Sequence, residues 1–189
     1  DQKRRLVITL TDSGQAELIS RLSGVCSKSQ MPDVMGWYAF MIRHYVRPYL
    51  PILFPHVRPT GFIFDRAMHP KDHFKLGGSR RYFSSNGSIY KETLPELAVK
   101  VAEASQGAVE KRLGRIYDEI IIDEVQDISR KSLDIIERLL SQATPHLILV
   151  GDVRQSLLDS DQTSSKNRNA DRLGLINWYR KHESAGLLE

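Results

Sequence analysis

The stretch EIIIDEVQDISRKSLDIIERLLSQATPHLILVGD, residues 119–152, decides the fold class. Two apolar runs, EIIID and HLILVGD, flank SRKSLDIIERLLSQ, whose apolar residues recur at the spacing of one helix face. A strand, a helix and a strand within about thirty residues form a βαβ unit, so we expect parallel strands with a right-handed crossover. Because neither run alternates apolar with polar residues, we expect a sheet covered on both faces. The predicted class is α/β.

A second strand and helix are predicted near the N-terminus. RRLVITLT, residues 4–11, has the pattern of a buried strand, and GQAELISRLSG, residues 14–24, that of a helix ending at Gly24. The part between the two α/β segments differs in composition, because Pro, Gly, Ser and His are frequent there. It is predicted to hold a helix over 33–49 ended by Pro48 and Pro51, a Gly/Arg/aromatic loop or hairpin over 75–88, and a helix capped by the TLPE box of 93–96.

The composition excludes some classes of protein. The 189 residues suffice for one large or two small domains, and no apolar run approaches the length of a membrane span. Cys26 is the only cysteine, which excludes an intramolecular disulfide and fits a reducing cytoplasm. The net charge of +4 is compatible with a nucleic-acid partner and equally with a solvated surface.

Carboxylates follow both strands of the βαβ unit. Asp123 and Glu124 come directly after III, and Asp152 follows LILVG. Because ligands of open parallel sheets bind beyond the carboxyl ends of the strands, both acidic sites should face one crevice. Oxygen ligands there suit Mg²⁺, and Glu124 could take a proton from an attacking water. The alternative reading is helix capping, for which Asp127 and Ser129 are candidates.

These residues resemble motifs of a known family. IIIDEVQD resembles motif II (Walker B) of the UvrD/Rep/PcrA class of superfamily 1 DNA helicases, and LILVGDVRQSLLDS resembles motif III, GDxxQ. LVITLTDSGQAELISRL is similar to motif Ia. The resemblance implies a RecA-like parallel sheet, a partial motor domain 1A, interrupted by a mainly helical 1B-type insertion. The implied domains are 1–32 and 115–189 for 1A, and 33–114 for the insertion.

The resemblance also implies roles for residues of the two strand ends. Asp123 would hold Mg²⁺ through water, and Glu124 would orient and deprotonate the water that attacks the γ-phosphate of ATP. Gln155 would sense that phosphate, and Asp152 would belong to the same nucleotide site. The implied function is an ATP-dependent helicase or translocase that moves 3′ to 5′ on single-stranded DNA, in repair, replication or phage defence.

Contacts to DNA are implied or suggested at three places. The resemblance puts Thr9 and Thr11 along the path of single-stranded DNA. Basic and aromatic residues interleave at Arg80, Arg81 and Tyr82, which suits a single-strand contact, although the aromatic residues could instead pack within their own subdomain. Lys166 and Arg168 lie in a second basic segment, where DNA contact and plain solvation are both open. The implied partners are single-stranded DNA or a junction with duplex, and a nuclease or other operon partner, with no membrane.

The sequence departs from the family pattern in several places. Leu10 and Leu158 stand where aromatic residues are common, and stacking there would be worth about 1–3 kcal/mol per base. The phosphate-binding loop GxxxxGK[ST] is not present in the 189 residues. The family places it before Asp1 and the later motifs after Glu189. We therefore expect a piece of a longer polypeptide, which alone neither binds ATP tightly nor hydrolyses it.

Two other functions stay open at this point. The chain could be a Mg²⁺-dependent nuclease or phosphohydrolase that uses Asp123, Glu124 and Asp152, although neither lysine nor histidine accompanies these acids and Gln155 would have no role. It could also be a non-catalytic module that uses a helicase fold to bind DNA or a protein.

Overall fold

The computed structural model describes residues 3–64, 77–152 and 172–188. The chain divides into two compact units. Unit 1 consists of Asp1–Phe40 and Glu110–Glu189, and unit 2 of Met41–Val109. Among the described residues, no helix is long and apolar enough to cross a membrane.

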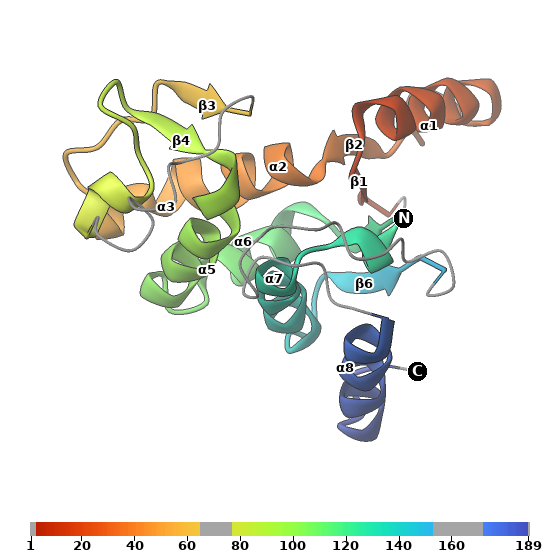
Figure 1. The fold of residues 1–189 in the computed structure, drawn as a ribbon. Coiled ribbons are helices and arrows are strands. Elements are labelled where there is room, and N and C mark those ends of the chain that lie inside the picture. The colour runs from red at the N-terminus through yellow and green to blue at the C-terminus, as the bar shows by residue number, and fades with distance from the viewer. Residues whose placement is uncertain (1–2, 65–76, 153–171, 189) are drawn as a thin grey trace. The chain divides into compact units, whose positions relative to one another are not determined.

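The described part of unit 1 is built on a four-stranded parallel sheet (Figure 1). The strand order is β2–β1–β5–β6, and every neighbouring pair is parallel. The bounds are β1 Arg5–Thr9, β2 Asp33–Gly36, β5 Glu119–Ile122 and β6 His146–Leu149. The predicted α/β class and the parallel pairing of the two strands of the βαβ unit are thus confirmed. The fold is consistent with a partial RecA-like domain.

The helices of unit 1 follow from capping and apolar spacing. Helix α7 begins after Ser129, whose side chain accepts a hydrogen bond from Ser132 N, and buries Leu133 and Ile136. Helix α1 begins after Thr11 and continues past Gly24, so the predicted end at Gly24 is slightly early. The bounds are α1 Asp12–Val25, α2 Trp37–Phe40, α6 Ala108–Ile116, α7 Arg130–Leu140 and α8 Arg172–Ser184.

The predicted helix over 33–49 is wrong at both ends. Asp33–Gly36 forms the edge strand β2, because its backbone pairs with β1. A helical segment then starts at Trp37, passes through a π-helical turn at Met41–Val46 and ends with α3, Arg47–Leu53. Pro48 and Pro51 lie inside α3 and do not end it. Pro48 is tolerated because it sits in the first turn of α3.

Unit 2 is mainly helical with a small sheet. Strand β3 (Gly61–Ile63) pairs in parallel with β4 (Ser88–Tyr90), and α5 (Leu94–Ala104) buries Leu97 and Val101. The predicted capping box is wrong, since the Thr93 hydroxyl donates to Tyr90 O at 3.2 Å and no side chain caps α5. The unit spans 41–109, a shorter stretch than the predicted insertion of 33–114, because β2 and most of α6 belong to unit 1.

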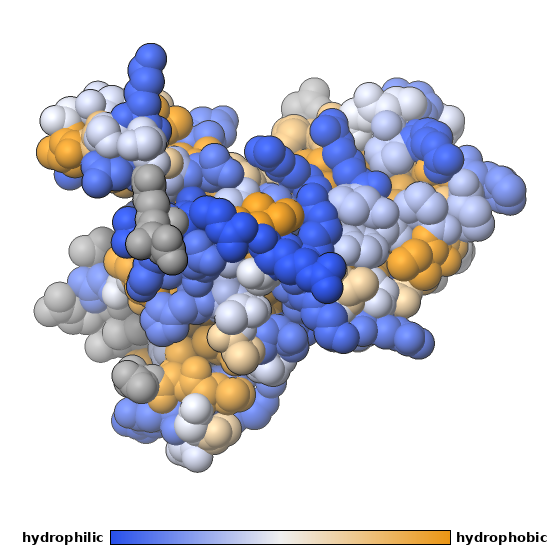
Figure 2. All heavy atoms as spheres, turned by 180° about the vertical axis from the view of Figure 1, so that it is seen from behind, coloured by the Kyte–Doolittle hydropathy of each residue, from blue (hydrophilic) through white to orange (hydrophobic). Residues whose placement is uncertain are grey.

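Strand β6 is an edge of the described sheet. Its residues alternate between exposed and half-buried. Ile148 within the strand is 36% exposed, and Val150, which follows the strand, is 46% exposed. The prediction that both strands of the βαβ unit are covered on both faces is therefore wrong for β6. An open groove lined by α7, β6 and α8 lies beside it, with Leu140 and Leu187 among its residues. Figure 2 shows apolar surface gathered at the level of α8.

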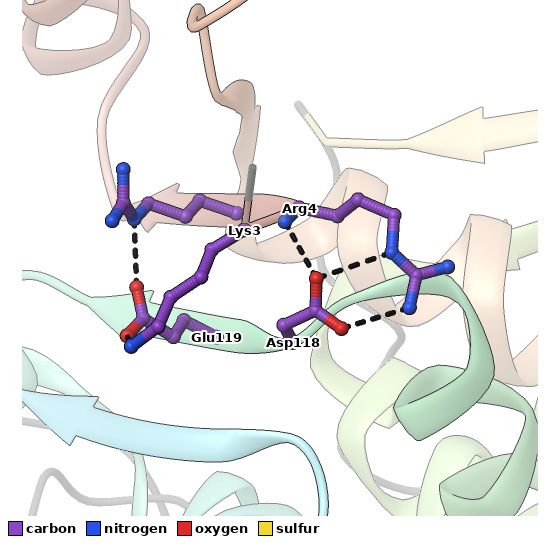
Figure 3. A network of polar contacts seen from close by, with 5 residues as sticks. Lys3, Arg4, Asp118 and Glu119 are labelled. Carbon is purple, nitrogen blue, oxygen red and sulfur yellow. Dashed lines mark hydrogen bonds and ion pairs between the residues drawn. The ribbon is translucent and has the colours of Figure 1, made fainter. Parts of the chain in front are cut away.

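Ion pairs join the amino ends of β1 and β5 (Figure 3). The backbone N–H and the guanidinium of Arg4 both donate to the Asp118 carboxylate, with Arg4 N to Oδ2 at 2.7 Å and Nη2 to Oδ1 at 2.8 Å. Glu119 accepts from Lys3 and, at 2.7 Å, from Arg5 Nε. The hydrogen bond from the Arg4 side chain is the main cause that lowers the pKa of Asp118 to about 2. These contacts fix the register of the two central strands.

This pairing predicts a loss of stability in acid. Because the pKa of Asp118 is lower in the folded chain than its ordinary value of about 3.9, folding gains stability above that value and loses it as the pH falls toward about 2. Urea midpoints measured from pH 5 to pH 2 should fall less steeply for Asp118→Asn than for the wild type. In an Arg4→Met background, Asp118→Asn should change the slope little. Equal slopes for wild type and Asp118→Asn would contradict this account.

Candidate functional site

The carboxyl ends of three strands meet at one edge of the sheet. Ile8 of β1 is in register with Ile122 of β5, and Ile122 with Leu149 of β6. The backbone continues this pairing past the strands, since Asp123 N donates to Ile8 O at 2.9 Å and Val150 N to Ile122 O at 2.8 Å. The parallel topology therefore brings the ends of the motif Ia-like, motif II-like and motif III-like segments together, as the sequence predicts.

Asp123 and Glu124 occupy a tight turn directly after β5. Asp123 is half-buried, and its Oδ1 accepts a hydrogen bond from Glu124 N at 2.9 Å. Glu124 is exposed and has a left-handed backbone, with φ 54° and ψ 40°. That conformation costs a non-glycine residue about 1–2 kcal/mol. It is held by its surroundings, because Val125 N, in the 3₁₀ turn Val125–Asp127, donates to Val150 O at 3.1 Å.

Gln126 links this turn to the start of the motif III-like segment. Its side chain is buried, its Nε2 donates to the Glu124 carboxylate, and its Oε1 accepts from Asp152 N at 3.2 Å. Gly151 makes this approach possible, because a Cβ there would lie 2.4 Å from Gln126 Oε1 and 2.9 Å from Val125 Cγ1. Two acidic segments 26 residues apart are thus joined through one amide.

Asp127 lies at the end of the same turn. Partial burial, with a smaller contribution from the negative charge of Glu124, raises the pKa of Asp127. The alternative in which Asp127 caps the following helix is wrong, because Ser129 occupies the cap position of α7. Capping therefore accounts for Ser129 and not for the acidic residues at the strand end.

The two threonines assigned to the DNA path serve local structure. Thr9 ends β1, is 3% exposed, and its Oγ1 donates to Thr11 O at 3.3 Å. Thr11 is exposed and caps α1, with its Oγ1 accepting from Gly14 N at 3.1 Å. Both lie on the segment that follows β1 at the carboxyl edge. A contact between them and DNA stays a prediction.

The basic and aromatic cluster of unit 2 is largely engaged within that unit. Arg81 pairs with both carboxylate oxygens of Glu96 at 2.7 Å, and the Tyr82 hydroxyl donates to Glu96 Oε1 at 2.9 Å. Tyr82 is 2% exposed, and its burial, reinforced by the Glu96 carboxylate, raises its pKa. The geometry therefore matches the alternative in which the aromatic residues pack inside their subdomain. Arg80 is exposed in the 3₁₀ turn Gly78–Arg81.

Several predicted site residues lie outside the described residues. They are Gln155, Leu158, Lys166 and Arg168. Their roles stay predictions.

The strand-end oxygens suit a sparsely coordinated cation. The described residues contain no group of three or more His, Cys, Asp or Glu side chains that could hold a metal. Mg²⁺ does not need such a group, because it binds through one or two carboxylates, waters and substrate phosphates. Asp123 fits this pattern, since Oδ1 is fixed by the Glu124 N–H and the half-buried carboxylate lies at the sheet edge.

Comparison with known proteins bears on the same segment. Residues 88–159 match the family model of the UvrD/REP helicase N-terminal domain. Residues 88–159 are thus similar to the N-terminal domain of UvrD/REP helicases. A protein from Limosilactobacillus fermentum, named as a subunit of an ATP-dependent helicase/nuclease, is 29% identical over 111 residues of alignment. That alignment covers 52% of this chain and 8% of the relative.

These matches confirm the predicted resemblance. The matched residues 88–159 contain β5, the turn with Asp123 and Glu124, α7 and β6, so the family match and the geometry of the carboxyl edge fall on the same residues. Sequence reasoning did not identify Gln126 and Gly151 as parts of the site. The sequence does contain a pattern that could have pointed to them: a glutamine two residues after the acidic pair, and a glycine directly before Asp152.

Proposed function

We propose that this chain is part of an ATP-dependent DNA helicase or translocase motor. The observation that carries the proposal is the fixed Glu124 carboxylate at the carboxyl edge of a parallel sheet, inside the segment that matches the UvrD/REP model. A left-handed backbone, held by neighbouring strands, is typical of functional sites. Movement on single-stranded DNA, 3′ to 5′, is the direction that the family resemblance implies.

Each residue of the turn has a role in this proposal. Asp123 holds Mg²⁺ through water, and Glu124 accepts a proton from the water that attacks the γ-phosphate. Gln155 senses that phosphate, and Asp152 belongs to the same site. Bound ATP with Mg²⁺ supplies the phosphoryl group and the charge that polarises it. The turn itself contributes position, because Asp123 and Gln126 each fix one part of Glu124.

The remaining parts of the motor lie elsewhere. We propose that residues outside this chain provide the phosphate-binding loop and the arginines of a second motor domain. Single-stranded DNA or its junction with duplex is the proposed substrate, in a cytoplasmic repair, replication or phage-defence pathway. The name of the relative, which joins helicase and nuclease, supports a nuclease as a partner or neighbouring activity. Arg80, being exposed, is the residue of the unit 2 cluster best placed to reach DNA.

The proposal is tested by comparing two proteins. The complete polypeptide that carries this chain should hydrolyse ATP with Mg²⁺, faster when single-stranded DNA is added. The 189-residue chain alone should show no DNA-stimulated turnover, because it lacks the GxxxxGK[ST] loop. Turnover by the chain alone that disappears in Glu124→Gln would refute the assignment of the phosphate loop to other residues. Cleavage of DNA with Mg²⁺ and without ATP would instead support the phosphohydrolase.

A further inference from the structure

The amide of Gln126 has a fixed orientation between two different partners. Nε2 can only donate and faces the Glu124 carboxylate, whereas Oε1 can only accept and faces Asp152 N–H. A flipped amide would place oxygen against carboxylate and N–H₂ against N–H. Because the side chain is 2% exposed, water cannot substitute for either partner at low cost.

The space that holds this amide depends on Gly151. A Cβ at position 151 would lie 2.4 Å from Gln126 Oε1 and 2.9 Å from Val125 Cγ1. The Gln126 side chain therefore packs directly on the backbone of the segment that leads into Asp152. A shift of that backbone must move the amide, and a shift of the amide must move the carboxylate it holds.

We propose that Gln126 is a positioning residue for Glu124 and couples its carboxylate to the backbone of residues 151–152. This inference rests on the proposed function, since Glu124 is the group that it positions. Without Gln126, Glu124 would be an exposed side chain on a short turn, free to sample several rotamers. The link gives the motif III-like segment, which leads toward Gln155, a direct physical connection to the catalytic carboxylate.

Two nearly isosteric variants of the complete polypeptide separate the two ends of the amide. Gln126→Glu keeps the acceptor for Asp152 N–H but sets a second carboxylate against Glu124. Gln126→Met keeps the length of the side chain and removes both hydrogen bonds. In both variants, kcat for DNA-stimulated ATP hydrolysis should fall about 10- to 100-fold, as for partners that orient reacting groups. KM for ATP should stay near the wild-type value, because Gln126 acts through Glu124.

The Asp152 amide gives a readout that a merely structural role would not produce. Hydrogen exchange at Asp152 N–H should rise about tenfold in Gln126→Met and stay slow in Gln126→Glu. Gln142→Glu, which follows α7 at the opposite end of the sheet, is the matched control and should change none of these quantities.

The outcomes distinguish this inference from the proposed function. If the wild-type polypeptide hydrolyses ATP but both Gln126 variants keep its kcat, the positioning role is refuted and the motor proposal stands. If the wild type shows no DNA-stimulated turnover, the motor proposal fails, and the exchange of Asp152 N–H still decides whether the amide link exists. Exchange that is equally slow in wild type and Gln126→Met would overturn the link itself.

Discussion

Replacing Glu124 with glutamine should lower DNA-stimulated ATP turnover by the complete polypeptide about 10²- to 10⁴-fold, the usual contribution of a general base. Glutamine is nearly isosteric with glutamate but cannot accept the proton of the attacking water. The fold should tolerate the change, because the side chain is exposed and the left-handed backbone at residue 124 is held by neighbouring strands. Single-turnover hydrolysis at saturating ATP measures the chemical step directly.

The matched control is another acidic residue of the same turn. Asp127 lies three positions on at the end of the same turn, and the proposed chemistry gives it no role, so Asp127→Asn should leave turnover near the wild-type value. Binding of ATP should persist in Glu124→Gln, since the phosphate loop and the Mg²⁺-holding Asp123 are unchanged. Retention of more than about a tenth of wild-type turnover by Glu124→Gln would exclude it as the general base.

Replacing Arg138 with alanine should destabilise unit 1 by about 3–5 kcal/mol. Glu110 of α6 is 1% exposed, and its Oε1 accepts a hydrogen bond from Arg138 Nε of α7 at 2.7 Å. Removal of the guanidinium leaves a buried carboxylate without its cation and without the hydrogen bond to Oε1, which is costly in a buried site. The free energy of unfolding from urea titration, followed by the fluorescence of the buried Trp37, measures the loss.

Two further variants isolate the cause of this loss. In Arg138→Ala combined with Glu110→Leu, most of the lost stability should return, because the buried charge is gone. Lys181→Ala removes the cation of a more exposed pair with Glu137 and should cost under about 1 kcal/mol. If Arg138→Ala and Lys181→Ala cost the same, the buried pair does not stabilise unit 1 as described.

The βαβ unit of unit 1 could be predicted from the sequence because the patterns that indicate it lie within short stretches of the chain. An unbroken III before Asp123, an apolar helix face through Leu133 and Ile136, and a second apolar run predict the βαβ unit, and the structure has it. The strand β2 could not be read in this way. Its residues Asp33–Gly36 run into an apolar helical pattern, and only pairing with β1 decides that they are extended.

The site could be read only in part. The position of Asp123 and Glu124 at the sheet edge could be predicted, because both acidic residues directly follow a buried strand. The role of Gln126 could not be predicted, because it depends on the distance between two segments that only the folded sheet brings together. At Arg81 and Tyr82 the sequence left DNA contact and packing within the subdomain open, because Glu96, which binds both side chains, lies on a different element.

The left-handed backbone at Glu124 places thermal stability and ATP turnover in conflict at one position. Glycine adopts that conformation without the steric cost that glutamate bears, so a library of variants sorted only by thermal survival should accumulate Glu124→Gly. The same substitution would delete the proposed base and the acceptor of the Gln126 amide. Selection of variants for thermal stability should therefore include a measurement of ATP turnover at every round. The substitution at position 124 that stabilises the fold would also remove the proposed base.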